Sequence, residues 1–185
     1  MQAPARVFLV PGLGNSGPGH WQTLLEQQHP AFTRVQQRDW DAPDRAEWVT
    51  TLSQALAGED LSRVVLVAHS LGCATVAHWA AQYGRAIRGA LLVAPADVEA
   101  APFATVPATG FGPMPLHPLP FASKVVTSSN DPWVTAERAR QFAQAWGSEL
   151  VEVGPRGHLN VASGHGPWPL AQALLADWLG PKPRP

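Results

Sequence analysis

Residues 64–72 read Val-Val-Leu-Val-Ala-His-Ser-Leu-Gly, an apolar run that delivers a serine onto a tight turn. An apolar run followed by a helical pattern predicts a buried strand, a turn and a helix. This is the context of a nucleophile elbow, in which strain at the turn exposes the hydroxyl of Ser70 above the sheet. The elbow pattern has glycine where this chain has Ala68, and a methyl group is the smallest departure from it. The alternative is an ordinary N-cap serine after a buried strand.

Short β-branched runs alternate with longer helical patterns along the whole chain. We predict strands at residues 6–10, 34–38, 63–67, 88–94, 124–128 and 149–153. We predict helices at residues 19–29, 45–57, 70–83, 134–146 and 167–179. This alternation predicts the α/β class, with about six parallel strands and helices on both faces of the sheet. The 185 residues suit one domain at residues 1–180, followed by a flexible tail at residues 181–185.

Composition narrows the classes of function. Apolar residues make up 45% of the chain and charged residues 15%, and the formal net charge is −1. This balance gives no reason to expect nucleic acid or an anionic membrane surface as a partner. The chain shows no signal peptide and no apolar run long enough to span a bilayer. Its single cysteine, Cys73, is expected to be a buried apolar residue, and the whole pattern favours the cytoplasm.

A serine nucleophile needs a base within hydrogen-bond reach and a third group to orient that base. Asp131 follows the fifth predicted strand and His158 follows the sixth, so both lie at the carboxyl edge of the sheet. The chain order serine, acid, histidine is that of α/β-hydrolases. Asp97, which follows the fourth strand, is a rival acid, and His165 is a rival base. We expect the ring of His69 to point away from the base, His158.

The glycine-rich stretch after the first strand supplies backbone to the same edge. Its glycines at positions 12, 14, 17 and 19 allow the chain to approach a ligand closely. We assign the two oxyanion donors to the amides of Leu13 and Leu71, with Gly14 as the fallback for Leu13. The glycine spacing fits no phosphate-binding motif, and no Walker lysine follows.

Residues near these loops are candidates for contact with a substrate. They are Gly14, Asn15, His20, Trp21 and Trp133. Four tryptophans on helices are instead expected to pack in the core, namely Trp48, Trp79, Trp146 and Trp178. The stretch at residues 95–120 contains seven prolines and either forms a wall of the pocket or only connects two strands.

Six segments resemble the small serine hydrolases related to retinoblastoma-binding protein nine. They are residues 11–21, 39–43, 68–72, 129–132, 157–160 and 163–169. By that resemblance Ser70, Asp131 and His158 form a catalytic triad, and the fold is a compact three-layer α/β-hydrolase fold without a large cap. The family has an aromatic residue where this chain has His165, so the resemblance assigns that position no role.

These observations lead us to expect a cofactor-free and metal-free serine hydrolase. Its expected substrate is a small-molecule acyl ester, cleaved through an acyl-enzyme. The same triad serves a thioesterase or an amidase, which is the first alternative. The second alternative is a non-catalytic binding protein on a hydrolase scaffold, with an unknown protein partner on the proline-rich stretch.

Overall fold

The computed structural model describes residues 4–180, and the predicted tail at residues 181–185 lies outside them. Six parallel strands form one sheet in the order β2-β1-β3-β4-β5-β6. They are β1 (Arg6–Val10), β2 (Phe32–Arg34), β3 (Val64–His69), β4 (Gly89–Val93), β5 (Ser123–Thr127) and β6 (Glu149–Glu152). The predicted α/β class with six parallel strands is confirmed.

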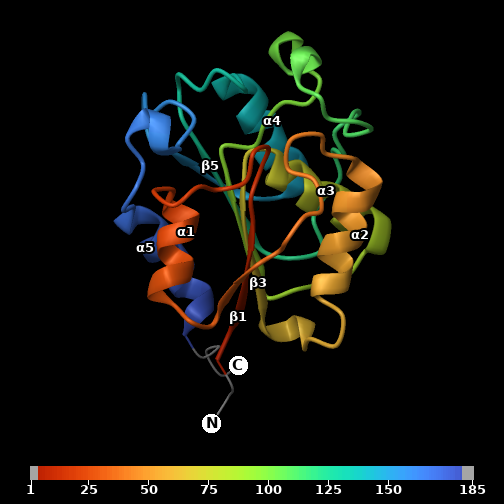
Figure 1. The fold of residues 1–185 in the computed structure, drawn as a ribbon, viewed down its shortest axis with the longest axis vertical. Helices are drawn as coiled ribbons and strands as arrows, with labels where there is room; N and C mark the ends of the chain where they lie inside the picture. The colour runs from red at the N-terminus through yellow and green to blue at the C-terminus, as the bar shows by residue number, and fades with distance from the viewer. Residues whose placement is uncertain (1–3, 181–185) are drawn as a thin grey trace.

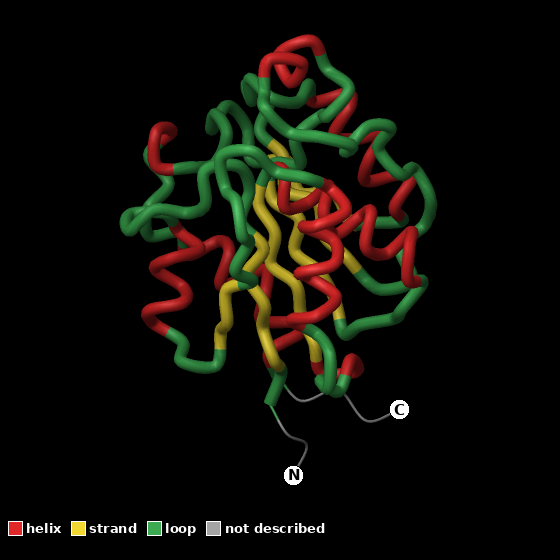
Figure 2. The backbone as a smooth tube through the Cα atoms, turned by 45° about the vertical axis from the view of Figure 1, so that its right-hand side comes forward, coloured by secondary structure: helices red, strands yellow, loops and turns green. Residues whose placement is uncertain are grey.

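Five α-helices of the described chain cover both faces of the sheet (Figure 1). On one face lie α1 (Trp21–Gln28) and α5 (Pro169–Leu179). On the other lie α2 (Arg45–Ala55), α3 (Leu71–Tyr83) and α4 (Ala136–Trp146). The strands stand between the two groups of helices (Figure 2). The predicted three layers are therefore present, and no large cap domain is built from residues 4–180.

The sheet separates two apolar cores because side chains of a strand alternate between its faces. Leu66 and Ala68 of β3 face the helices α2, α3 and α4, whereas Val65 and Val67 face α1 and α5. The four helical tryptophans expected in the core are all buried there, as predicted, and they are Trp48, Trp79, Trp146 and Trp178.

Most elements differ from the prediction by one or two residues at an end, and the boundaries of β2 and α4 differ for identifiable reasons. Strand β2 ends at Arg34, where we expected it to begin, because its pairing with β1 starts at Phe32. The edge position leaves it only three residues long. Helix α4 begins at Ala136, two residues later than expected, because the Thr135 hydroxyl accepts a hydrogen bond from the Arg138 N–H (3.1 Å) and caps the helix.

Residues 95–120, called the wall segment below, first rise above the carboxyl ends of the strands and then descend to the start of β5 (green in Figure 1). They contain one short 3₁₀ helix, Ala101–Thr105. Beyond that helix the segment is tied to the body of the protein. The Arg45 N–H donates to the Thr109 carbonyl (3.0 Å), His78 Nε2 donates to the Phe111 carbonyl (2.7 Å), and the Trp146 indole donates to the Pro115 carbonyl (2.8 Å).

Candidate active site

Ser70 occupies the sharp turn between β3 and α3. Its backbone angles are φ 54° and ψ −122°, a strained conformation for a residue with a side chain. The Ser70 N–H donates to the Val93 carbonyl (3.0 Å), which ties the turn to the neighbouring strand. This is the geometry that the sequence predicted for an elbow, because an ordinary N-cap residue has extended angles and bonds the helix with its side chain. The Ser70 side chain makes no such capping bond.

Close packing beneath the turn explains the small residues on either side of Ser70. A Cβ atom on Gly72 would lie 2.1 Å from the Val10 carbonyl oxygen, so any other residue there would push α3 away from β1. Ala68 is completely buried, and its methyl group is accommodated in the core on the α2 side. The departure from the usual glycine at this position therefore leaves the elbow intact.

The structure brings Ser70 together with Asp131 and His158. His158 Nε2 lies 2.9 Å from Ser70 Oγ, and His158 Nδ1 lies 2.9 Å from each carboxylate oxygen of Asp131. A carboxylate only accepts hydrogen bonds, so Nδ1 carries the proton and Nε2 is left to accept from the serine hydroxyl. Asp131 and His158 are both buried, which shields these bonds from water.

The loops that carry the acid and the histidine are fastened to each other. Residues 154–160, called the base loop below, follow β6. Ser128 Oγ accepts from the Arg156 N–H (2.8 Å), and Asn130 Oδ1 accepts from the Gly157 N–H (2.7 Å). Ser128 Oγ also donates to Asn130 Oδ1 (2.9 Å), so the two acceptor atoms keep their positions relative to each other. These bonds fix the distance between Asp131 and the base loop.

The other side of the base loop is held by two aromatic side chains. The Trp21 indole N–H donates to the Leu159 carbonyl (2.9 Å), and Leu159 is a buried residue with φ 50°. His69 Nε2 lies 2.9 Å from the His158 carbonyl, and only a protonated Nε2 can form that bond. The His69 ring centre is 4.9 Å from that of His158. Our expectation that His69 points away from the base is therefore wrong.

The two rival residues make other contacts. Asp97 pairs with Arg138, whose Nε is 3.3 Å from the carboxylate, and not with His158. His165 Nδ1 is 3.3 Å from Ser163 Oγ, and its ring packs edge-on against Trp168. Neither residue is near enough to replace Asp131 or His158.

Two backbone amides next to Ser70 have no acceptor among residues 4–180. They are the N–H groups of Leu13 and Leu71, the predicted oxyanion donors. The fallback residue Gly14 donates its N–H to the Trp40 carbonyl (2.8 Å), so it is occupied. Leu71 begins α3, where the first N–H groups of a helix lack internal partners and favour negative charge.

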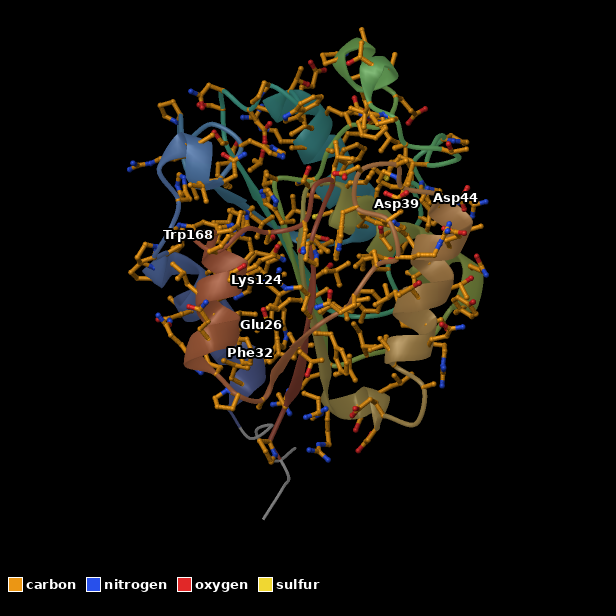
Figure 3. All side chains as sticks on the ribbon, in the orientation of Figure 1. Glu26, Phe32, Asp39, Asp44, Lys124 and Trp168 are labelled. Carbon is orange, nitrogen blue, oxygen red and sulfur yellow. The ribbon has the colours of Figure 1, made fainter. Side chains whose placement is uncertain are left out.

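Arg34 holds the glycine-rich loop in place from below. Its guanidinium donates to Asn15 Oδ1 (2.9 Å), to the Ser16 carbonyl (2.8 Å) and to Thr23 Oγ1 (2.6 Å). A salt bridge of 2.7 Å to Glu26 on α1 completes the set (Glu26 is labelled in Figure 3). The Arg34 side chain is almost fully buried, so this network orders the loop that supplies the Leu13 amide.

A cavity of about 230 Å³ opens above Ser70 and His158. One part of its lining is apolar and comes from the glycine-rich loop, the elbow, the wall segment and the loop after β5; these residues are Leu13, Leu71, Ala96, Phe103, Val106 and Trp133. The other part is polar and uncharged at neutral pH, and consists of Asn15, His20, His69 and Asn160. The wall segment therefore contributes to the pocket as well as connecting two strands.

The predicted substrate contacts are only partly placed in this cavity. Asn15, His20 and Trp133 line it, but Gly14 and Trp21 do not. Trp21 is buried and its indole is committed to the base loop, which corrects its assignment as a pocket residue. Phe103 and Val106 were missed, because no periodicity marks which residues of a proline-rich stretch face a site many residues away.

Burial keeps two histidines near Ser70 uncharged. Burial, and after it the positive charges of Arg34, His158 and His165, lower the pKa of His20 from 6.5 to about 4. Burial also holds the pKa of His69 well below its usual range. Both rings are therefore neutral at pH 7, so neither of them places a positive charge beside His158.

The sequence matches the family described as Serine hydrolase over residues 7–177. The chain belongs to this serine hydrolase family. The match covers nearly all of the described residues and confirms the resemblance to small serine hydrolases that the motifs indicated. No curated protein matches the sequence.

Solved structures support the same family and fold. A YdeN-like hydrolase from Pectobacterium atrosepticum is 35% identical, with a TM-score of 0.83 over 95% of this chain and 90% of that one. The ydeN gene product of Bacillus subtilis is 21% identical, with a TM-score of 0.79 over 94% and 98% of the two chains. The type II thioesterase BorB from the borrelidin biosynthetic cluster shares the fold at 16% identity, with a TM-score of 0.62 over 96% and 94%.

The helices of residues 4–180 include none that is both long enough and apolar enough to cross a membrane.

Proposed function

We propose that this serine hydrolase cleaves small carboxylic esters through a covalent acyl-enzyme. The observation that carries the proposal is the continuous hydrogen-bond path from Ser70 Oγ through the His158 ring to the Asp131 carboxylate, with 2.9 Å at each step. A serine hydroxyl is a weak nucleophile at neutral pH, and an oriented histidine is the group that activates it.

In the first half of the reaction, Ser70 Oγ attacks the ester carbonyl while His158 Nε2 takes the hydroxyl proton. The carbonyl oxygen becomes an anion, and we assign its stabilisation to the N–H groups of Leu13 and Leu71, which have no acceptor among residues 4–180. Asp131 stabilises the imidazolium that has formed. The bond between the carbonyl carbon and the alcohol oxygen then breaks, and His158 gives its proton to the departing alkoxide.

In the second half, water replaces the alcohol. His158 Nε2 takes a proton from the water as its oxygen attacks the acyl carbon. The new tetrahedral anion binds the same two amides. Its collapse breaks the bond to Ser70 Oγ, which recovers a proton from His158, and the carboxylic acid leaves.

The lining of the cavity supports a small, uncharged substrate. None of the lining residues is an aspartate, glutamate, lysine or arginine, and about half of them are apolar. A charged substrate would lose its hydration without gaining an ion pair. The proposal also places the enzyme in the cytoplasm, where a chain whose one cysteine is buried and free needs no disulfide.

The test is covalent labelling with a fluorophosphonate probe, followed by mass spectrometry of the modified peptide. We expect an adduct on Ser70 in the wild type and none in Ser70→Ala. The variant should melt at nearly the wild-type temperature, because only one hydroxyl is lost at a turn whose backbone bonds remain. Absence of labelling in a folded wild-type protein would contradict the proposal and favour the binding scaffold.

A panel of esters, thioesters and amides with the same acyl group then identifies the bond that is cleaved. We expect kcat/KM to be highest for the esters. Faster turnover of the thioesters or of the amides, by protein that the probe labels fully on Ser70, would retain the triad mechanism and overturn the ester assignment.

A further inference from the structure

His20 is the polar cavity residue whose function the proposed mechanism leaves open. It lies directly before α1 and lines the cavity together with Ser70 and His158. Its ring centre is 4.9 Å from that of His69, which in turn lies 4.9 Å from that of His158. The side chain is almost completely buried, so whatever reaches it must enter through the cavity.

The first nitrogen of the His20 ring is used by the fold. Nδ1 accepts a hydrogen bond from the Gln22 N–H (3.2 Å) and so caps α1. A nitrogen that accepts cannot carry a proton, and in a neutral imidazole the proton must then be on the other nitrogen. The helix cap therefore fixes the tautomer of His20 with hydrogen on Nε2.

The second nitrogen has no partner in the protein. Among residues 4–180 no acceptor lies within hydrogen-bond distance of His20 Nε2. His20 Nε2 is not one of the fully enclosed polar atoms that lack a partner, and His20 lines the cavity. This nitrogen is therefore accessible from the cavity. In the free protein only water can accept from this N–H, and a ligand oxygen in the cavity can take the place of that water.

Burial, and after it the basic groups around His20, keep this donor neutral. The titratable groups near it are Arg34 and the rings of His69, His158 and His165. All four of these groups are bases, and no carboxylate stabilises a proton on His20. Its pKa of about 4 leaves it uncharged throughout the neutral range, so it offers one directed hydrogen bond and no charge.

We propose that His20 is a specificity-determining residue whose Nε2–H binds an uncharged oxygen of the substrate beyond the reacting ester group. The preferred substrates are then esters that combine an apolar part with an ether, hydroxyl or carbonyl oxygen. The apolar part packs against Phe103, Val106 and Trp133, and the oxygen meets His20. The inference rests on the proposed ester hydrolysis and names the class of ester.

Two substitutions separate the two nitrogens of the ring. Asparagine at position 20 places its amide oxygen near the site of Nδ1 and is among the best N-cap residues, so His20→Asn keeps the cap. Its NH2 group lies closer to the main chain than the site of Nε2, so the donor is withdrawn from the cavity position that His20 Nε2 occupies. Glutamine is longer and places an amide N–H near the site of Nε2, so His20→Gln keeps the donor and loses the cap. Stability and selectivity should therefore change in different variants.

Two pairs of substrates, in which one oxygen replaces one methylene group, test the recognition. In the alcohol part the pair is 2-methoxyethyl acetate and n-butyl acetate. In the acyl part the pair is p-nitrophenyl methoxyacetate and p-nitrophenyl butyrate. The ratio of kcat/KM within each pair is divided by the ratio of the alkaline hydrolysis rates, which removes the difference in intrinsic reactivity. The two pairs show whether the oxygen belongs to the alcohol or to the acyl group.

We expect the corrected ratio to favour the oxygen-containing ester by about threefold to tenfold in the wild type for one of the pairs, as a single neutral hydrogen bond provides. His20→Asn should bring that ratio close to one, and His20→Gln should keep most of it. The melting temperature should behave in the opposite way, with a loss of about 2–4 °C in His20→Gln alone.

Two results would overturn the inference. One is a corrected kcat/KM ratio near one for both pairs in the wild type, a result that does not depend on whether any variant folds. The other is a preference that survives unchanged in His20→Asn. Fluorophosphonate labelling of the wild type keeps this test separate from the proposed function: no adduct on Ser70 overturns both, whereas an adduct with no preference overturns only the role of His20.

Discussion

The base loop and the wall segment both border Ser70, yet hydrogen bonds hold them at different places relative to the residues that face the cavity. The main chain of the base loop is bound at four successive residues by polar side chains from other elements, including Ser128, Asn130 and Trp21. The wall segment is hydrogen-bonded to the body of the protein at Thr109, Phe111 and Pro115, beyond its 3₁₀ helix. The two apolar side chains that it offers to the cavity, Phe103 and Val106, lie before those anchors.

This difference suggests a division of roles. Oriented hydrogen bonds resist small displacements, which a proton transfer over 2.9 Å requires. Apolar contacts have little directionality and tolerate different ligand shapes. Changes around the base loop should therefore act on the chemical step, and changes in the wall segment should act on substrate binding.

The largest expected effect on activity comes from replacing Asp131, the proposed acid that orients His158. Asp131→Asn should lower kcat by about 10³–10⁴-fold, because an amide facing His158 Nδ1 favours the wrong tautomer of the ring. Steady-state kinetics with a p-nitrophenyl ester measure the loss, and thermal melting checks the fold. The control is Asp97→Asn, which removes the rival carboxylate. If the control lost as much activity as Asp131→Asn, the assignment of the acid would have to change.

The next effect concerns the pH dependence of stability. The pKa of His20 is lower in the folded protein, about 4, than its ordinary 6.5, so the unfolded chain binds the proton more tightly. Its contribution to stability is complete above pH 6.5 and is lost as pH falls through about 4, a loss of ~3 kcal/mol. His69 acts in the same direction.

Urea unfolding between pH 7 and pH 4 measures this loss. His20→Asn carries no titrating group at that position, so its stability should fall less steeply than that of the wild type over the same range. Parallel curves for the two proteins would show that His20 is not held neutral by the fold.

A smaller effect tests the polar support of the base loop. Asn130→Ala removes the acceptor for the Gly157 N–H and should lower kcat about fivefold to tenfold with little change in KM. The control is Ser129→Ala, which changes the exposed neighbour of Asn130, away from the cavity lining. An increase in KM at unchanged kcat in Asn130→Ala would contradict the division of roles.

The smallest effect tests the wall segment. Phe103→Ala should raise KM about threefold for esters with an apolar acyl chain and leave kcat within about twofold, because only apolar contact is lost. Leu170→Ala, at an exposed position on α5, is the matched control. A loss confined to kcat in Phe103→Ala would mean that the wall segment positions the reacting groups.

Much of the site was predictable because it depends on local signals. The elbow at Ser70 was recognisable from an apolar strand, a turn and a helix within nine residues. The positions of Asp131 and His158 after the fifth and sixth strands followed from the rule that carboxyl ends of parallel strands share one edge. Cys73 and the helical tryptophans are buried as expected from their places on apolar faces.

Contacts between distant segments were less predictable. The sequence left Asp97 and His165 as rivals, and the ion pair of Asp97 with Arg138 decides against one of them. The sequence placed Trp21 in the pocket and turned His69 away from the base, and both predictions were wrong. Each error concerns the direction of a side chain at the edge of the sheet, where several directions fit the same local pattern.

The sequence by itself determined the succession of strands and helices along the chain, the elbow at Ser70, and the loops that carry Asp131 and His158. Local propensity and the geometry of parallel sheets are sufficient for these. Only the tertiary structure decided which side chains meet: that His69 and Trp21 hold the base loop, that Arg34 orders the glycine-rich loop, and that the wall segment turns Phe103 to the cavity. Such contacts join residues far apart in the chain, and they depend on packing that no local pattern encodes.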